Sequence, residues 1–366
     1  MYSSEIKTYG FNTPPLAILD ILNSIVFNRD VVIYVSDLLV APFPYEEIAA
    51  REKSNLIVVI YSAEGHAYRE FRQTIDRLIN ECGVLRSNII IHSSALADSS
   101  NSNIKIIPSL SGLIGTSVTG AAVDLNVSYR QYSPTHLYVC LNRLPRWERA
   151  AIIQGLHDRK LDHRGKMSYY TVKMDRANDL EVARQAFSPG LRPKIPMILD
   201  QKGMSISDGF SISSNYITGA LFNIMTESSY EYKNYLEDPH SEAVVSQCSP
   251  GITEKTFKTF IMGQIPIFVA SKDTVKHTRD LGFDVFDDIV DHSYDSIVDP
   301  AARIEAILDQ VEVLCNRYSD ADLIKLKNKI QLRLEHNVDV LKAYTFNHKR
   351  STAQWVEHFA EIGVVG

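Results

Sequence analysis

The chain has 366 residues, of which 45% are hydrophobic and 22% charged, and its formal net charge is −6 at pH 7. This length suits two domains of ordinary size, and the composition is that of a globular protein. A mildly acidic total argues against wholesale wrapping by nucleic acid, although it allows a local basic cleft. The four cysteines form no CxxC pair, so neither a zinc ribbon nor a redox motif is expected.

The sequence carries no sign of export or of membrane insertion. Its first residues, MYSSEIKTYGFNTPP, lack the charged region followed by an apolar region that marks a signal peptide. No stretch reaches the roughly 18 apolar residues of a membrane-spanning helix. We therefore expect a soluble cytoplasmic protein without a membrane span, and buried free cysteines would suit that reducing compartment.

The first third of the chain alternates strand and helix patterns. Apolar residues at helical spacing predict helices over residues 14–26 and 66–82, the first with proline at its start. Short, continuously apolar strands separated by helices are typical of a parallel sheet covered on both faces. We therefore predict an N-terminal α/β domain over residues 1–130. Its predicted strands span residues 30–35, 55–61, 88–92 and 104–107.

A second α/β series follows the first. We predict a C-terminal α/β domain over residues 131–334 and a helical tail over residues 335–366. The predicted fold is α/β, with two doubly wound, Rossmann-like domains facing a cleft and the C-terminal helices packing back toward the N-terminal domain. The predicted strands of the second series span residues 137–141, 223–225 and 265–270, and its helices span 146–160, 256–262, 301–317 and 320–333.

The first strand of the second series leads into a cluster of polar and basic residues, CLNRLPRWERAAII. Asn142, Arg143, Arg146 and Arg149 lie between the strand end and the first turn of the next predicted helix. A helix N-terminus favours an anion, whereas a cation there opposes the helix dipole. Clustered guanidinium groups at this point therefore suit a phosphate ligand. Alternatively, Arg146 and Arg149 pair with Glu148 or with other surface acids.

A second cluster, SPGITEKTFKTF, opens another predicted helix. Thr253 is a good N-cap residue, and Glu254 suits the positive end of the helix dipole. Lys255 and Lys258 are not helped by that dipole, so they suit an anion in front of the helix. Glu254 could then accept hydrogen bonds from two adjacent hydroxyls, as the acid of dinucleotide-binding folds does with ribose. Read alone, the segment favours a helix cap over a ligand site.

Acidic residues in two further segments allow two interpretations each. In NIMTESSYEY a strand brings Thr226 and Glu227 to a sheet edge, where the acid could hold a sugar hydroxyl or lie solvated in a loop. The acids of residues 281–291 have a spacing that suggests Mg²⁺, which needs one or two carboxylates plus substrate phosphates. Because they alternate with Phe and Ile, we expect a structured loop with solvated acids and no metal site.

The segment Ile252 to Ala270, ITEKTFKTFIMGQIPIFVA, resembles the donor-site signature of fucosyltransferase-type members of the two-domain (GT-B) glycosyltransferases. In that signature a Thr-Glu-Lys triplet opens a helix, and a small residue and an apolar strand with proline follow. Gln264 departs from it, because those enzymes often carry a small or apolar residue there. The matching residues are Thr253, Glu254, Lys255, Gly263, Ile265, Pro266 and Ile267.

The sequence is also similar to glycosyltransferase-like proteins common in bacteriophage genomes. Those proteins carry a strand followed by Asn-Arg and further arginines, as at residues 142–149, and a Thr-Glu pair, as at residues 226–227. Downstream they have runs similar to residues 281–283 and 291–295. The resemblance covers about residues 137–312, with its blocks in order. The N-terminal third matches no family we can name, which suits an acceptor domain that varies with the acceptor.

The resemblance implies a nucleotide-diphosphate sugar as donor substrate, with no bound cofactor and no metal. Glu254 would bind the ribose or the sugar, while Lys255, Arg143 and Arg146 would neutralise the departing diphosphate. The fucosyltransferase relatives use a carboxylate base from the N-terminal domain, and nothing here matches it residue by residue. The nearest candidates, each also interpretable as a plain loop residue, are Asp37, Glu64 and His66.

The resemblance leaves the acceptor open. One candidate is a hydroxymethylated base of phage DNA, and the other is a glycan or small glycoside. The alternatives to a glycosyltransferase are a sugar-nucleotide epimerase or hydrolase on the same fold, and a nucleotide-binding module without catalysis.

Overall fold

The computed structural model divides the chain into two compact units, and each contains one parallel sheet. Unit 1 comprises Met1–Val123, Gly251–Thr253 and Lys342–Gly366, and unit 2 comprises Asp124–Pro250 and Glu254–Leu341. The predicted boundaries at residues 130 and 334 stay predictions. The structure describes residues 4–9, 30–36, 43–62, 72–93, 104–108, 132–142, 146–169, 181, 183–198, 219–227, 252–345, 357 and 359–360.

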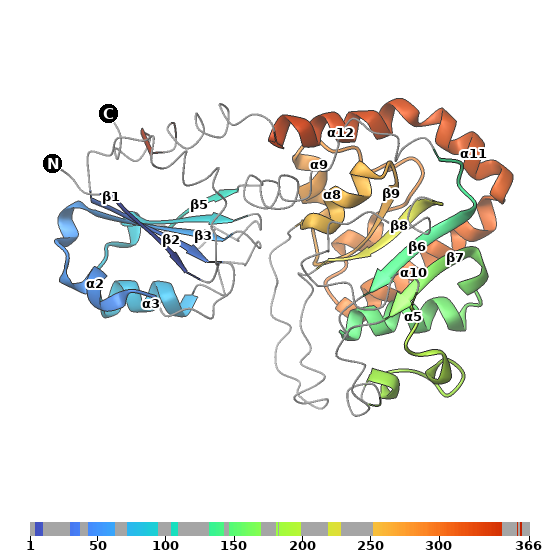
Figure 1. The fold of residues 1–366 in the computed structure, drawn as a ribbon, viewed down its shortest axis with the longest axis horizontal. Coiled ribbons are helices and arrows are strands. Elements are labelled where there is room, and N and C mark those ends of the chain that lie inside the picture. Colours follow the sequence, from blue (N-terminus) through green and yellow to red (C-terminus); the bar gives the residue numbers. More distant parts are fainter. Residues whose placement is uncertain are drawn as a thin grey trace. The chain divides into compact units, whose positions relative to one another are not determined.

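The sheet of unit 1 has five parallel strands in the order β1-β2-β3-β4-β5 (Figure 1). All four strands predicted for this part are confirmed. The additional strand, β1, has the sequence SEIKTY, which contains no apolar run. The predicted helix over residues 14–26 lies outside the described residues. The elements are β1 (Ser4–Tyr9), β2 (Asp30–Ser36), α2 (Tyr45–Ala50), β3 (Leu56–Ser62), α3 (Arg72–Asn80), β4 (Ile89–Ser93) and β5 (Lys105–Pro108).

Both faces of this sheet are buried, as the continuous apolar strands predict. Val58 and Ile60 of β3 pack in a cluster with Ile75 and Leu78 of α3. Val59 lies between Val58 and Ile60 in the strand and is also fully buried. Because consecutive strand residues point to opposite faces, the second face is also covered.

The sheet of unit 2 has four parallel strands in the order β7-β6-β8-β9. The chain runs from β6 to β7 on one side and then returns to place β8 on the other side of β6. This reversal creates a topological switch point between β6 and β8. The elements are β6 (His136–Asn142), α5 (Trp147–Asp158), β7 (Gly165–Tyr169), β8 (Ala220–Thr226), α8 (Glu254–Ile261), β9 (Ile265–Val269), α9 (Thr274–Asp280), α10 (Pro300–Arg317), α11 (Asp320–Lys329) and α12 (Gln331–Thr345).

Three elements of unit 2 differ from the sequence prediction. Strand β7 is an edge strand whose sequence, GKMSY, is too polar to register as an apolar run. Helix α9 is short, with the polar sequence TVKHTRD. The helix predicted over residues 320–333 is two helices, because α11 ends before Ile330 and α12 begins after it. Ile330 is buried, and no Gly or Pro marks the break in the sequence.

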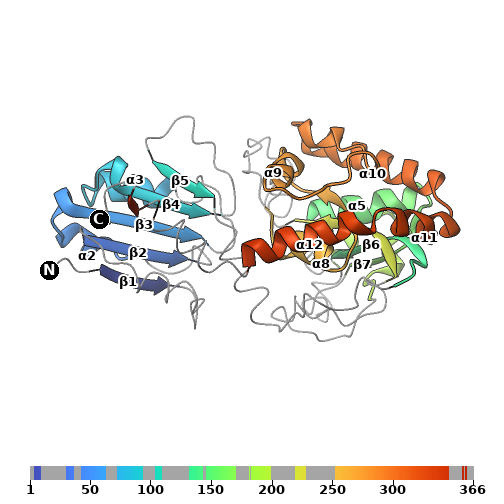
Figure 2. The ribbon, with the colours of Figure 1, turned by 90° about the horizontal axis from the view of Figure 1, so that it is seen from above.

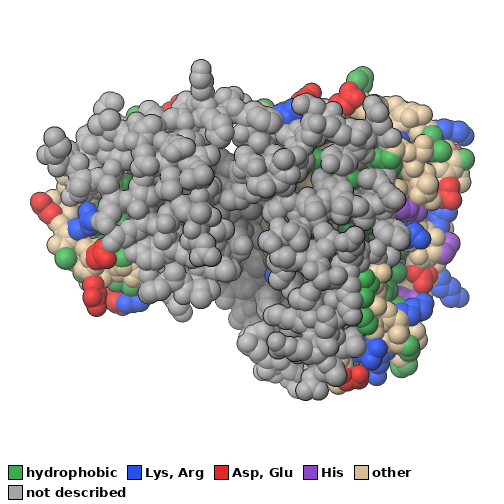
Figure 3. Space-filling model, viewed as in Figure 1, with side chains coloured by type: hydrophobic (Ala, Val, Ile, Leu, Met, Phe, Trp, Pro, Cys, Tyr) green, Lys and Arg blue, Asp and Glu red, His purple; other side chains and the backbone are tan. Residues whose placement is uncertain are grey.

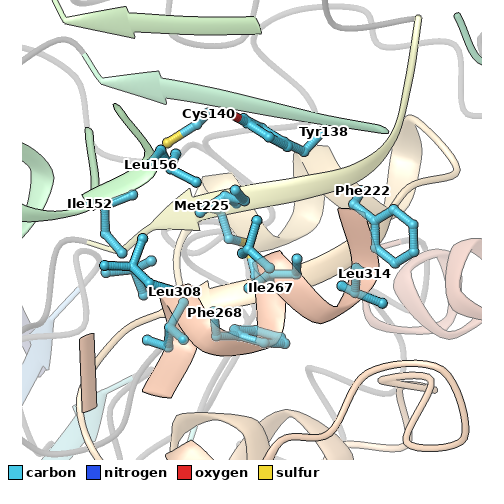
Figure 4. Packing of buried hydrophobic residues seen from close by; sticks show 14 of the residues in the cluster. Tyr138, Cys140, Ile152, Leu156, Phe222, Met225, Ile267, Phe268, Leu308 and Leu314 are labelled. Carbon is cyan, nitrogen blue, oxygen red and sulfur yellow. The ribbon is translucent and has the colours of Figure 1, made fainter. Parts of the chain in front are cut away.

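The helices of unit 2 lie on both faces of its sheet, which is α/β as predicted (Figures 1 and 2). Phe222 of β8 contacts Tyr318, which follows α10, whereas the neighbouring Asn223 donates a hydrogen bond to Thr259 of α8. Consecutive strand residues point to opposite faces, so α10 and α8 cover opposite sides. Figure 4 shows the core on which β6, β8, β9, α5 and α10 converge.

Three of the four acids of residues 281–291 form ion pairs, which corrects the expectation that these acids are merely solvated. Arg333 binds Asp284 at 2.6 Å and Asp288 at 2.8 Å, and Arg279 binds Asp287 at 2.7 Å. Burial opposes ionisation of Asp284, but Arg333 holds the pKa of its carboxyl below the ordinary value. Figure 3 shows cationic and anionic side chains interspersed over the described surface of unit 2.

Two absences concern the residues that the structure describes. They contain no group of three or more His, Cys, Asp or Glu side chains arranged to hold a metal ion. No helix among them has both the length and the apolar character needed to cross a bilayer.

At Gly165, strand β7 passes close to the buried ring of Tyr138. A Cβ at this position would lie 2.4 Å from Tyr138 Cε2 and 2.6 Å from Cγ, and the Tyr138 hydroxyl is fixed by a hydrogen bond to the Leu161 carbonyl. Gly165→Ala should therefore lower the free energy of unfolding by about 1–3 kcal/mol, measured by urea denaturation. The matched control is Gly190→Ala, whose Cβ would meet only His157 Nε2, at 3.8 Å. Equal stability of the two variants would contradict the close approach.

A buried histidine joins β9 to the loop after α9. The Phe268 N–H donates to the Tyr294 hydroxyl over 3.2 Å, and that hydroxyl lies 2.7 Å from His292 Nδ1. His292 Nε2 lies 2.8 Å from the Val285 carbonyl, which can only accept. The Val285 carbonyl therefore assigns a proton to Nε2, and in the neutral ring the Tyr294 hydroxyl donates to Nδ1. Burial lowers the pKa of His292 below its ordinary value of 6.5.

This arrangement predicts a loss of stability in mild acid. A depressed pKa in the folded state means that His292 contributes stability above pH 6.5, the ordinary value, and loses that contribution as the pH falls below it. Urea unfolding at a series of pH values from neutral into mild acid should show a larger loss for the wild type than for His292→Gln. The same pH dependence in both proteins would refute the assignment.

Candidate functional site

The carboxyl edge of the unit 2 sheet is the candidate functional site. Strands β6, β7, β8 and β9 are parallel, so their last residues lie at the same edge. Helices α5 and α8 begin after this edge, and each presents its N-terminus there. In open α/β sheets, ligands bind outside the carboxyl ends of the strands at the switch point, which here lies between β6 and β8.

Asn142 and Thr226 bridge this switch point through a buried hydrogen bond. The Thr226 hydroxyl donates to Asn142 Oδ1 over 2.7 Å, and both residues are almost completely buried. The Asn142 amide group donates to Cys140 Sγ, while its backbone N–H donates to Ser168 Oγ of β7. The two predicted binding residues thus come together and join the ends of three strands. Contact with a ligand stays a prediction for both.

Glu227 follows Thr226 directly and faces the other side of the sheet. It is fully buried, and the Thr256 hydroxyl of α8 donates to Glu227 Oε1 over 2.5 Å. The backbone N–H of Glu227 donates to the Val269 carbonyl of β9 over 2.9 Å. This corrects the alternative in which Glu227 is a solvated loop acid, because β8 delivers it into the interior beside α8.

The first turn of α5 places two ionisable residues in the interior. Glu148 and Arg149 are only 3% and 4% exposed, and Arg149 Nε lies 3.9 Å from Glu148 Oε1. The alternative in which Arg149 pairs with Glu148 is therefore confirmed, but Glu148 is a buried acid and not a surface one. Arg146 occupies the N-cap position, where no side-chain hydrogen bond caps the helix.

The electrostatics of this turn connect it to the end of β8. Burial lowers the pKa of Arg149, and the neighbouring Arg146 lowers it further. The charges of Glu148 and Glu227 act in the opposite direction, so both carboxylates lie within electrostatic range of Arg149. Burial raises the pKa of Glu148 against the opposing effect of Arg149. Arg146, Glu148, Arg149 and Glu227 are called the charge cluster below.

The remaining predicted site residues fall into two groups. Thr253 is buried and directly precedes α8, and Lys255 and Lys258 are half-buried on that helix. Of Glu254 the structure describes only the backbone, as the first residue of α8. Four predicted residues lie outside the described residues, namely Asp37, Glu64, His66 and Arg143.

Thr256 was not singled out from the sequence, and the burial of Arg149 was not predicted, although helical spacing carries a signal for both. Arg149 precedes Ile152, Ile153 and Leu156 by three, four and seven positions, which places it on the buried face of α5. Thr256 precedes the buried Phe260 by four positions. A charged or hydroxyl residue on the apolar face of a helix at a strand end therefore indicates a buried polar contact.

Comparisons with known proteins add no relatives. The sequence matches no family model, and neither the curated proteins nor the solved structures contain a significant match to it.

The bridge at the switch point predicts a stability effect. Thr226→Val keeps the shape of the side chain but removes the donor to Asn142 Oδ1, leaving a buried acceptor without that bond. We expect a loss of about 1–3 kcal/mol in the free energy of unfolding, measured by urea denaturation. Thr278→Val is the control, since Thr278 is also fully buried and its hydroxyl bonds only to a carbonyl of its own helix, that of Thr274. A loss no larger than in the control would argue against the bridge.

Proposed function

We propose that the chain is a glycosyltransferase of the two-domain (GT-B) type. It would move a sugar from a nucleotide-diphosphate sugar to an acceptor hydroxyl, with unit 2 binding the donor and unit 1 the acceptor. The observation that carries the proposal is the buried guanidinium of Arg149, at a helix N-terminus beside the ends of β6 and β8. Burying a cation is costly unless it is compensated, so its place at this edge supports a role in binding an anion.

The chemistry of the proposed reaction suits these groups. When the sugar leaves, negative charge develops on the diphosphate, and fixed positive groups that meet this charge lower the barrier. Arg149, Arg146 and the N-termini of α5 and α8 supply such groups. Lys255 and Lys258 of α8 add two half-buried cations. This arrangement would not require a metal ion to neutralise the leaving group.

The proposal has two candidate acceptors and two rival enzymatic functions. A hydroxymethylated base of phage DNA and a glycan remain the two candidate acceptors. A sugar-nucleotide epimerase or hydrolase would use the same donor site, and incubation with a radiolabelled donor distinguishes them. Label on an added acceptor supports a transferase, whereas label in free sugar or in an isomerised donor supports a hydrolase or an epimerase.

A thermal-shift panel of nucleoside diphosphates and nucleotide sugars tests the proposal. A ligand that binds the folded state raises the melting temperature according to its concentration relative to its Kd. At least one member should stabilise the protein. A panel without any shift would overturn the donor site.

Lys255 provides the variant test of the same site. Lys255→Ala should weaken binding of the best nucleoside diphosphate at least about tenfold by calorimetry, because a cation close to the diphosphate is lost. Lys276→Ala is the matched control, since it removes the same charge from α9, where the exposed Lys276 pairs with Asp280. If both variants weakened binding equally, the loss would reflect only the lower net charge of the protein. Lys255 would then not be part of the donor site.

A further inference from the structure

Glu148 brings a buried carboxylate oxygen without a hydrogen bond to the candidate site. It lies in the first turn of α5 and is almost completely buried. Its Oε1 atom has no hydrogen-bond partner in the described part of the chain. Charged groups in a protein interior are normally paired and hydrogen-bonded, because the loss of hydration is costly. An acceptor left open in this position therefore requires an explanation.

The ion pair with Arg149 does not use this acceptor. Arg149 Nε lies 3.9 Å from Glu148 Oε1, which is beyond the distance of a hydrogen bond. Burial raises the pKa of Glu148, although the charge of Arg149 acts in the opposite direction. The neighbouring guanidinium therefore compensates the burial of this carboxylate only in part.

Other carboxylates of unit 2 show how a structural acid is bonded. Both oxygens of Asp295 accept backbone N–H groups at the start of α9, over 3.0 and 2.9 Å. Both oxygens of Asp284 accept from Arg333, over 2.6 and 2.9 Å. These two acids are half-buried, whereas Glu148 is buried. The more deeply buried acid thus has the fewer bonds, which is the reverse of what stability alone would favour.

The Glu148 carboxylate is turned toward the N-terminal end of α5. It accepts a hydrogen bond from its own backbone N–H, one of the N–H groups that a helix leaves free at its start. Helix α5 begins after the end of β6, whose last residue, Asn142, forms the bridge to Thr226 at the switch point. The open oxygen therefore lies at the carboxyl edge of the sheet, where folds of this kind bind ligands.

We propose that Glu148 binds a hydroxyl group of the ligand through Oε1. A hydroxyl donates a charge-assisted hydrogen bond to a carboxylate, whereas a phosphate would be repelled by it. This inference rests on the proposed function, in which the donor carries hydroxyls on its ribose and on the transferred sugar. It assigns Glu148 to one of these hydroxyls and leaves the diphosphate to the cations of the site.

The rival interpretation is that Glu148 only balances the charge of Arg149. The two interpretations differ in how the protein treats analogues that lack a hydroxyl. If Glu148 is only a counter-charge, its removal changes the affinity for every analogue by the same factor. If Glu148 binds a hydroxyl, its removal abolishes the preference for the analogue that carries this hydroxyl.

Glu148→Met and Glu148→Gln test this difference as a matched pair. Both remove the same charge and keep a similar size, but only Gln retains an acceptor oxygen. The probes are the nucleoside diphosphate with the largest thermal shift, its 2′-deoxy and 3′-deoxy forms, and the matching nucleotide sugar, all titrated by calorimetry.

The wild type should bind the form that lacks the recognised hydroxyl at least about tenfold more weakly. That ratio of Kd values should fall to about one in Glu148→Met and take an intermediate value in Glu148→Gln. Glu305→Gln is the control, because it removes an exposed acid of α10, and it should keep the wild-type ratio.

The panel also identifies the source of the hydroxyl. A preference for the ribose form over a deoxy form, lost in Glu148→Met, assigns a ribose hydroxyl. Tighter binding of the nucleotide sugar than of the nucleoside diphosphate, lost in Glu148→Met, assigns a hydroxyl of the transferred sugar. A Glu148→Met protein that keeps every preference of the wild type would overturn the inference, and so would a wild type without any preference.

These outcomes separate the inference from the proposed function. If the wild type binds a nucleoside diphosphate and Glu148→Met has the same preferences, the role of Glu148 is refuted while the donor site stands. If the wild type binds no member of the panel, both proposals are refuted. Should Glu148→Met fail to fold, Glu148→Gln decides alone. Its ratio must lie below that of the wild type, since a neutral acceptor binds a hydroxyl less tightly than a carboxylate does.

Discussion

The buried positive charge of Arg149 is the constraint on which the candidate site depends. An ionised group in a protein interior costs several kcal/mol unless opposing charges and hydrogen bonds compensate it. Glu148 supplies one opposing charge from the same helix turn, and Glu227 supplies another from the end of β8. The first turn of α5 is therefore constrained, because separating Arg149 from Glu148 would leave two charges in an interior that cannot solvate them.

Side chains alternate along β8, so its last residue and the residue after it contact different elements on the two faces of the sheet. Thr226 points toward the face of α5 and bonds to Asn142, whereas Glu227 points toward α8 and bonds to Thr256. Two consecutive residues thus connect the end of β8 to β6 on one face and to α8 on the other. A shift of β8 by one residue would turn Thr226 and Glu227 to the opposite faces of the sheet and break both bonds. The register of β8 in the sheet therefore determines the geometry of the site.

The sequence predicted those parts of the molecule that depend on apolar pattern. The strands β2, β3, β6 and β9 follow from continuous apolar runs that only a doubly covered sheet can bury. The pattern did not predict β7 or α9, because an edge strand and a short polar helix owe their conformation to their neighbours rather than to their own residues. The residues of the site could be placed at strand ends, but not their partners. Whether Glu227 meets water or Thr256 depends on how α8 packs against the sheet, which no local spacing specifies.

The composition of the charge cluster suggests how an anion would be selected. Arg146 and Arg149 are balanced in formal charge by Glu148 and Glu227, and the whole chain is acidic. The cluster therefore exerts little attraction on a distant anion. It contributes at short range, where the interaction energy depends on the orientation of the charged groups. The half-buried Lys255 and Lys258 are better placed to attract a diphosphate from solvent. In the proposed donor site the lysines would raise the rate of encounter, whereas the buried arginine would discriminate among the anions that arrive.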